Sequence, residues 1–158
     1  MTKTAFLFAG QGAQKTGMAS DLYEKHAIVR ETFEQASHVL GYDLRELIDN
    51  DEDKLNQTRF TQPAILTTSV AIFRLLQEKG FQADMVAGLS LGEYSALVAS
   101  GALDFEEAVR LVAKRGEFME TAAPAGTGKM VAVMQLTGAF VQPLILIMTN
   151  LPKISSGR

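Results

Sequence analysis

Short runs of consecutive apolar residues alternate along the chain with longer stretches in which apolar residues recur every three or four positions. The runs at 4–10 and 83–88 each end in glycine, which is typical of buried parallel strands. The run at 129–136 predicts a third strand, and residues 43–57 predict short polar helices and loops. The helical spacing covers 18–40, 61–80, 91–100 and 104–123. Strands that alternate with helices predict an α/β fold with a parallel sheet.

Residues at the ends of the helical stretches support these boundaries. Gly41 is placed to end the first helix, Pro63 lies near the first turn of the second, and Gly80 follows its last turn. Asp104 precedes the fourth helix and Glu107 stands three positions later, which is a variant of the capping box. The second helix is apolar over most of its surface, so we expect it to be buried.

The composition narrows the classes of function. The chain has 158 residues, of which 47% are hydrophobic and 21% charged, and its formal net charge is −3. These values suit one globular domain or part of a larger one. The charges form no basic stripe, which argues against a nucleic-acid partner. The sequence has no cysteine, which excludes disulfides and thiolate metal sites. We expect no metal and no cofactor.

The apolar runs are too short for a membrane span. The longest, 143–148, falls far below the roughly 20 residues that a transmembrane helix needs. The N-terminal run reaches glycine too early for a signal peptide. We therefore expect a soluble cytoplasmic protein without a membrane partner.

The stretch 88–92, GLSLG, joins the second predicted strand to the next helix and fits the pattern G-x-S-x-G. In a nucleophile elbow the glycines allow so tight a turn that the serine side chain stands clear, and the helix N-terminus favours developing negative charge. The alternative is a tight structural turn that needs a small residue at Ser90. A strand before the motif and a helix after it favour the nucleophile.

The stretch GQGAQ, 10–14, follows the first predicted strand. Ligands of α/β proteins bind at the carboxyl ends of parallel strands, and glycines there let backbone N–H groups approach an oxygen closely. A phosphate-binding P-loop requires glycine directly before its lysine, but Gln14 precedes Lys15. The stretch 126–130 also fails, because Met130 replaces the hydroxyl residue. We reject a P-loop; taken alone, GQGAQ is more often a simple strand-to-helix turn.

One arginine interrupts an apolar helix face. Positions 105, 108, 112, 115, 119 and 122 step by threes and fours and are apolar except for Arg115. A guanidinium in an apolar stripe must pair or reach solvent, and its fork matches a carboxylate. The stripe alone leaves two interpretations open: a clamp for an anionic substrate, or an ion pair with a carboxylate of the protein.

The two histidines precede the serine. His26 and His38 lie in the first helical stretch, and no histidine follows Ser90. In hydrolase-type sheets the order is serine, acid, histidine, so the base is expected after the elbow. We interpret both histidines as surface or helix-packing residues.

Four motifs in order carry a resemblance to a family: FLFAGQGAQ, TQPAILTTSVAIFRLL, GLSLGEYSALVASGALDFEEAVRLVAKRGEFME and GTGKMVAVM. Together they resemble the malonyl-CoA:acyl carrier protein transacylases of bacterial fatty acid synthesis, over about residues 2–134. The resemblance implies an α/β-hydrolase-like core that transfers malonyl from malonyl-CoA to the phosphopantetheine thiol of acyl carrier protein. The resemblance implies no cofactor, since malonyl-CoA is the substrate.

The resemblance also implies roles for individual residues. Ser90 resembles the nucleophile that carries the malonyl ester. Gln11 and Leu91 match the oxyanion-hole residues, which act through their backbone N–H groups. Arg115 is similar to the arginine that binds the free carboxylate of the malonyl group. Gln62 and Met119 match positions near the acyl pocket.

The sequence departs from the family in two places. Leu89 stands where many members have histidine, and we expect a small effect on the pocket. Members are also longer, with a ferredoxin-like small subdomain and a later catalytic histidine. We therefore expect residues 1–134 to be the N-terminal part of the acyltransferase domain and 135–158 a divergent tail, through truncation or a shifted reading frame. We expect this chain alone to be weak or inactive, with apolar surface and strand edges exposed.

Two other functions share the same motif. A serine esterase of the α/β-hydrolase type would use the same elbow, but its reaction would not require Arg115. A non-enzymatic fragment that binds a carrier protein would not be acylated at Ser90.

Overall fold

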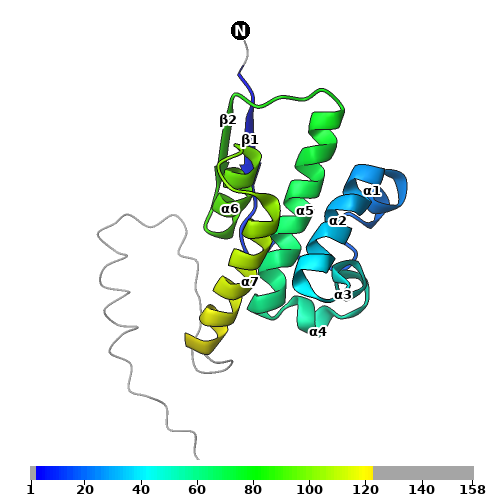
Figure 1. The fold of residues 1–158 in the computed structure, drawn as a ribbon, viewed down its shortest axis with the longest axis vertical. Coiled ribbons are helices and arrows are strands. Elements are labelled where there is room, and N and C mark those ends of the chain that lie inside the picture. The colour runs from blue at the N-terminus through cyan, green and yellow to red at the C-terminus, as the bar shows by residue number, and fades with distance from the viewer. Residues whose placement is uncertain (1–2, 123–158) are drawn as a thin grey trace, which may run out of the picture. The chain divides into compact units, whose positions relative to one another are not determined.

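The computed structural model describes residues 3–122, and their elements alternate between strand and helix as predicted (Figure 1). Strand β1 (Ala5–Phe8) pairs in parallel with β2 (Met85–Gly88), and Phe8 lies opposite Gly88. The predicted α/β fold with parallel strands is confirmed. Because the strands are parallel, their carboxyl ends meet at one edge, where the Gln11 and Ser90 loops begin. The predicted strand at 129–136 and the expected boundary at 134 lie outside the described residues.

Seven helices are found within residues 3–122. They are α1 (Ser20–Lys25), α2 (Ala27–Leu40), α3 (Leu44–Asn50), α4 (Glu52–Leu55), α5 (Thr58–Glu78), α6 (Leu91–Ala99) and α7 (Phe105–Ala122). The first five lie between β1 and β2 in the sequence, and α6 and α7 follow β2. The long crossover is what a parallel strand pair requires.

Helix α5 is the centre of the core. It packs against α2 on one side and against α6 and α7 on the other (Figure 1). Its predicted burial is confirmed, since Leu66, Val70 and Ala71 have no exposed surface. Each large aliphatic side chain buried in this way stabilises the fold by about 1.5–3 kcal/mol. Phe73, also on α5, packs edge-on against Phe6 and Phe8 of β1, with ring centroids 6.1 Å apart in both pairs.

The predicted start of this helix was wrong. Helix α5 begins at Thr58 rather than near Thr61, so Pro63 lies inside the helix and not in its first turn. Proline has no N–H, so the carbonyl of Arg59 lacks its usual intrahelical donor. This hydrogen bond is lost about one turn from the start of the helix. The neighbouring backbone groups there already take partners from other elements.

The predicted helix over 18–40 is interrupted at His26. This residue is extended, with φ −127° and ψ 121°, and separates α1 from α2. The break leaves carbonyls at the end of α1 without helical donors, and the Arg30 guanidinium donates to those of Tyr23 and Glu24 at 2.9 and 3.1 Å. Gly41 ends α2 as predicted, in the left-handed conformation at φ 77°.

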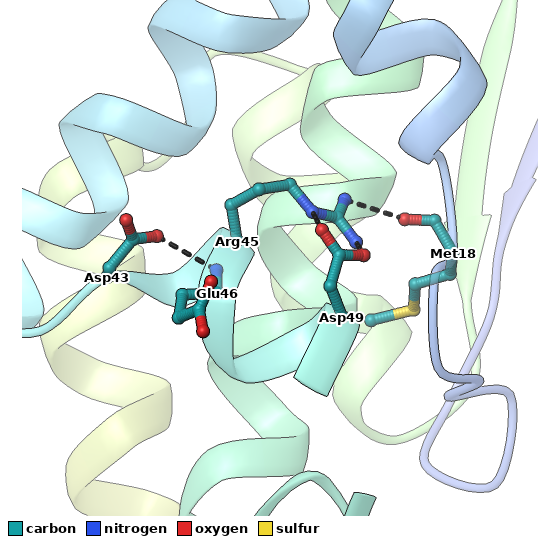
Figure 2. A network of polar contacts seen from close by, with 5 residues as sticks. All are labelled: Met18, Asp43, Arg45, Glu46 and Asp49. Atoms are coloured by element: carbon teal, nitrogen blue, oxygen red, sulfur yellow. Dashed lines mark hydrogen bonds and ion pairs between the residues drawn. The ribbon is translucent and has the colours of Figure 1, made fainter. Parts of the chain in front are cut away.

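A buried arginine joins α3 to the loop that follows β1. Arg45, which is 7% exposed, donates through Nε and Nη2 to the Asp49 carboxylate and through Nη1 to the Met18 carbonyl at 2.9 Å (Figure 2). Its guanidinium also lies over the rings of Tyr23 and Phe33. Helix α3 was predicted as polar, but one of its faces is buried. The residues on that face are Leu44, Arg45, Leu47 and Ile48.

The strands are less buried than their apolar runs predicted. Leu7 is 80% exposed and Met85 56%. The reason is that the sheet has two strands within residues 3–122, so its apolar positions lack further strands and a covering layer there. The expectation of exposed apolar surface is thereby confirmed for this part of the chain. None of the helices in residues 3–122 is long and apolar enough to cross a membrane.

Replacing Arg45 tests the buried network. Arg45→Ala is expected to lower the free energy of unfolding by about 2–3 kcal/mol, because Asp49 and the Met18 carbonyl lose their partner in a mostly buried place. Arg110→Ala is the control: it removes an exposed pair with Glu106 and is expected to cost about 0.5 kcal/mol or less. Urea unfolding measures both. Equal losses would contradict the importance of the buried network.

Candidate active site

The turn at Ser90 has the geometry of an elbow. Ser90 has φ 53° and ψ −104°, a conformation that costs a non-glycine residue about 1–3 kcal/mol. A Cβ on Gly88 would lie 2.0 Å from the carbonyl carbon of Gly92, and one on Gly92 would lie 2.2 Å from the Phe8 carbonyl oxygen. Both positions therefore require glycine, and the serine side chain is left exposed at the start of α6.

The loop that carries Gln11 lies against this turn. A Cβ on Gly10 would lie 2.8 Å from the carbonyl oxygen of Leu89, so the two backbones are in direct contact. Leu91 is the first residue of α6, and its N–H has no acceptor within the helix. The positive end of the α6 dipole adds to the attraction for an anion there. The predicted pair, Gln11 and Leu91, thus stands at one edge of the sheet beside Ser90.

Arg115 reaches the serine from α7. Its Nη2 donates to the Ser90 Oγ at 3.2 Å, and its guanidinium carbon lies 5.7 Å from the centre of the Tyr94 ring. Among residues 3–122, no carboxylate lies within 4.0 Å of this guanidinium. Of the two interpretations of the apolar stripe, the ion pair thus finds no partner in the described part of the chain. The N-terminal part of the stripe, Phe105 to Val112, is buried as core.

A chain of neutral polar side chains connects the remaining predicted residues. Gln11 Nε2 donates to Thr58 Oγ1 at 3.1 Å, and Gln62 Nε2 lies 3.4 Å from Gln11 Oε1 and 3.1 Å from Met119 Sδ. Gln62 has no exposed surface, and its Oε1 has no partner within the described residues. An unpaired buried carbonyl of this kind costs about 1–3 kcal/mol. The structure therefore brings Gln11, Gln62 and Met119 together.

Sequence reasoning missed two residues that contact the predicted site residues. Tyr94, whose ring lies beside the Arg115 guanidinium, is four positions after Ser90, so helical spacing was a signal that could have found it. Thr58 holds the Gln11 side chain, but it lies before the predicted start of its helix and gave no such signal. Neither histidine makes a hydrogen bond with the serine: among residues 3–122, the hydrogen-bond partner of Ser90 Oγ is Arg115. That part of the chain also has no group of three acidic or histidine side chains able to hold a metal.

The fold and the turn at Ser90 are those of the serine acyl-transfer proteins with an α/β core. The chain belongs to the acyl transferase domain family, because residues 5–149 match the sequence model of that family. The match continues past residue 134, where the sequence motifs end.

Individual relatives agree with the family. The chain is 52% identical over 143 residues to the malonyl CoA-acyl carrier protein transacylase of Escherichia coli K12, covering 89% of this chain and 46% of that protein. Its sequence is 70% identical to that of MCAT from Streptococcus pneumoniae, whose crystal structure it matches with a TM-score of 0.86. The match covers 92% of this chain and 48% of that one. A second structure holds a type II PKS acyl-carrier protein in complex with its malonyl-transacylase. That match is 51% identical with a TM-score of 0.77, over 80% of this chain and 41% of the other. The chain spans about half the length of the relatives it matches.

The strain at Ser90 can be measured through stability. Ser90→Gly is expected to raise the free energy of unfolding by about 1 kcal/mol relative to Ser90→Ala, because glycine adopts a positive φ without a steric penalty. Ser90→Ala is the matched control, since it also removes the hydroxyl and the Arg115 contact but keeps the Cβ. Chemical denaturation compares the two variants. A glycine variant no more stable than the alanine variant would show that the turn carries no strain.

Proposed function

We propose that the chain carries the nucleophile and the acyl-binding residues of an acyl-carrier-protein S-malonyltransferase of fatty acid biosynthesis. The observation that carries the proposal is the approach of Arg115 to within 3.2 Å of Ser90 Oγ on an elbow of the acyl transferase family. A serine that is paired with a cation can take an acyl group whose far end is anionic. The family's malonyl CoA-acyl carrier protein transacylases support malonyl as that group.

The reaction proceeds as two acyl transfers through Ser90. Ser90 Oγ forms a bond to the thioester carbon of malonyl-CoA, the carbon–sulfur bond breaks, and CoA leaves as the thiol with the serine proton. The phosphopantetheine thiol of acyl carrier protein then attacks the seryl ester and regenerates the hydroxyl. The backbone N–H groups of Gln11 and Leu91 stabilise the oxyanion in both steps. A carrier protein as partner is supported by the similar transacylase that was crystallised with one.

Arg115 selects the acyl group by its charge. In malonyl, one methylene separates the thioester carbonyl from the free carboxylate. A guanidinium already beside Oγ can therefore bind that carboxylate in bidentate fashion after a small movement of its side chain. The carboxylate then replaces the Ser90 hydroxyl as the partner of Arg115 and frees the Oγ lone pairs for attack. Gln62 on α5 and Met119 on α7 contact each other, and the proposal assigns both to the acyl pocket because the resemblance does.

The serine proton requires a base that His26 and His38 do not supply. Both precede Ser90 in the sequence, and within the described part of the chain neither forms a hydrogen bond with Oγ. The resemblance assigns this role to a histidine in the half of the relatives that this chain does not match. The proposal includes a cytoplasmic location, as expected for an enzyme that uses CoA thioesters.

The role of Arg115 is tested by comparing two acyl donors. The chain is fused to the second half of the Streptococcus pneumoniae protein, and seryl acylation is followed by mass spectrometry. Arg115→Ala is expected to reduce the preference for malonyl-CoA over acetyl-CoA by about 10–100-fold, because a charge-assisted pair is lost. Arg110→Ala, on the same helix but paired with Glu106 at the surface, is the control. An esterase would show equal rates with both donors in all variants.

The need for an outside base is tested with the same fusion protein. Residues 1–158 alone are expected to acylate Ser90 at least about 100-fold more slowly than the fusion, because general base catalysis contributes about 10²–10⁴-fold. Ser90→Ala gives the background rate for both. Transfer by the 158-residue chain at the rate of the fusion, abolished by Ser90→Ala, would contradict this part of the proposal.

A further inference from the structure

Helix α7 touches the beginning of α5 at a point without side chains between the two backbones. A Cβ on Gly116 would lie 2.7 Å from the Arg59 Cα and 2.8 Å from the Thr58 carbonyl oxygen. Glycine is therefore required at this crossing, because the backbone of α5 occupies the space that a side chain would need. Gly116 is buried, while Arg115 directly before it is only half-buried.

One turn further along α7, a carboxylate caps α5. Glu120 Oε1 accepts a hydrogen bond from the backbone N–H of Arg59 at 3.1 Å, across 61 residues of sequence. Arg59 is the second residue of α5, so this N–H has no acceptor within its own helix. The N-cap residue, Gln57, provides no side-chain cap. Glu120 thus performs the task that a local serine or aspartate usually performs, and its charge complements the helix dipole.

The residues that form this crossing are next to the site residues in the sequence of both helices. On α7, Arg115 and Met119 directly precede Gly116 and Glu120. On α5, Thr58 and Gln62, which hold Gln11 and Met119 by side-chain contacts, lie within the first five residues of the helix. Any slide or rotation of α7 along α5 therefore moves the guanidinium relative to Ser90. A displacement of about 1 Å at a reacting group can cost about 100-fold in rate.

We propose that Gly116 and Glu120 are positioning residues, which fix α7 on the start of α5 and thereby set Arg115 against Ser90. Their effect is on selectivity for an acyl group with a free carboxylate, so this inference rests on the proposed function. Neither residue touches the substrate. Glu120 acts through the Arg59 amide, and Gly116 acts by allowing the close approach.

The test uses five variants of the 158-residue chain, of which one is a matched control. Glu120→Ala removes the cap, and Glu120→Gln keeps an oxygen that can accept from the Arg59 N–H. Gly116→Ala introduces the clash, and Arg115→Ala removes the guanidinium itself. Glu117→Ala is the matched control. This carboxylate is on the same helix but pairs with Lys114 at 2.7 Å, a hydrogen bond that lowers the pKa of Glu117.

The first measurement needs no ligand. Amide hydrogen exchange at Arg59 is expected to become about fivefold faster in Glu120→Ala, the loss typical of an N-cap, and to stay near the wild-type rate in Glu120→Gln and Glu117→Ala. An Arg59 amide that exchanges equally fast in the wild type and in Glu120→Ala would overturn the capping role, whatever the chain binds.

The second measurement is the ratio of the dissociation constants for malonyl-CoA and acetyl-CoA. Glu120→Ala and Gly116→Ala are expected to lower the preference for malonyl-CoA at least about threefold, with Glu120→Gln and Glu117→Ala near wild type. Equal weakening toward both ligands, or a loss of thermal stability with the preference intact, would overturn the inference. If Arg115→Ala and the wild type show the same ratio, the proposed function fails instead, and the exchange data still decide the capping role.

Discussion

The close approach of three backbone segments at Phe8, Gly88 and Gly92 is the constraint on which the site depends. The Phe8 carbonyl oxygen occupies the space where a side chain at Gly92 would begin, and Gly88 is packed as tightly against Gly92. This contact sets α6 directly on the ends of both strands. Ser90, between the two glycines, is consequently forced into its positive φ. The same contact brings the start of α6 beside the Gln11 loop, so the two N–H groups and the hydroxyl share one edge.

Helix α5 adds polar side chains beside this edge of the sheet. Its middle is core, where Leu66 and Val70 are fully buried, but its first turns carry polar residues toward Gln11. The side-chain amide of the fully buried Gln62 destabilises the core, because its Oε1 is unpaired within residues 3–122. Burial along the rest of the helix offsets that loss. A rigid apolar helix can therefore present a polar end without becoming mobile.

The periodic signals of the sequence located both described strands and most of the helices, because burial selects apolar residues at regular spacing. The errors arose where a contact from outside the element decides. At the interruption near His26, Arg30 donates to a carbonyl at the end of α1, and at the early start of α5 Glu120 accepts from the Arg59 N–H. For Arg115, the helical spacing of the sequence indicated a charged residue on an apolar face. Its neighbours, Ser90 and Tyr94, became known only from the structure. Local patterns contain no information on such distant partners.

Two non-glycine residues of the described chain have a positive φ, and they bracket the Gln11 loop in space. Ser90 lies against its beginning, through the Gly10–Leu89 contact, and Ala19, with φ 59°, follows its end. Beside Ala19, Arg45 holds the Met18 carbonyl from the buried side. Strained conformations persist only where surrounding contacts overdetermine them. The fold thus stabilises both ends of this loop at some cost. The oxyanion role proposed for the Gln11 N–H requires a backbone that is held in place in this way before the charge develops.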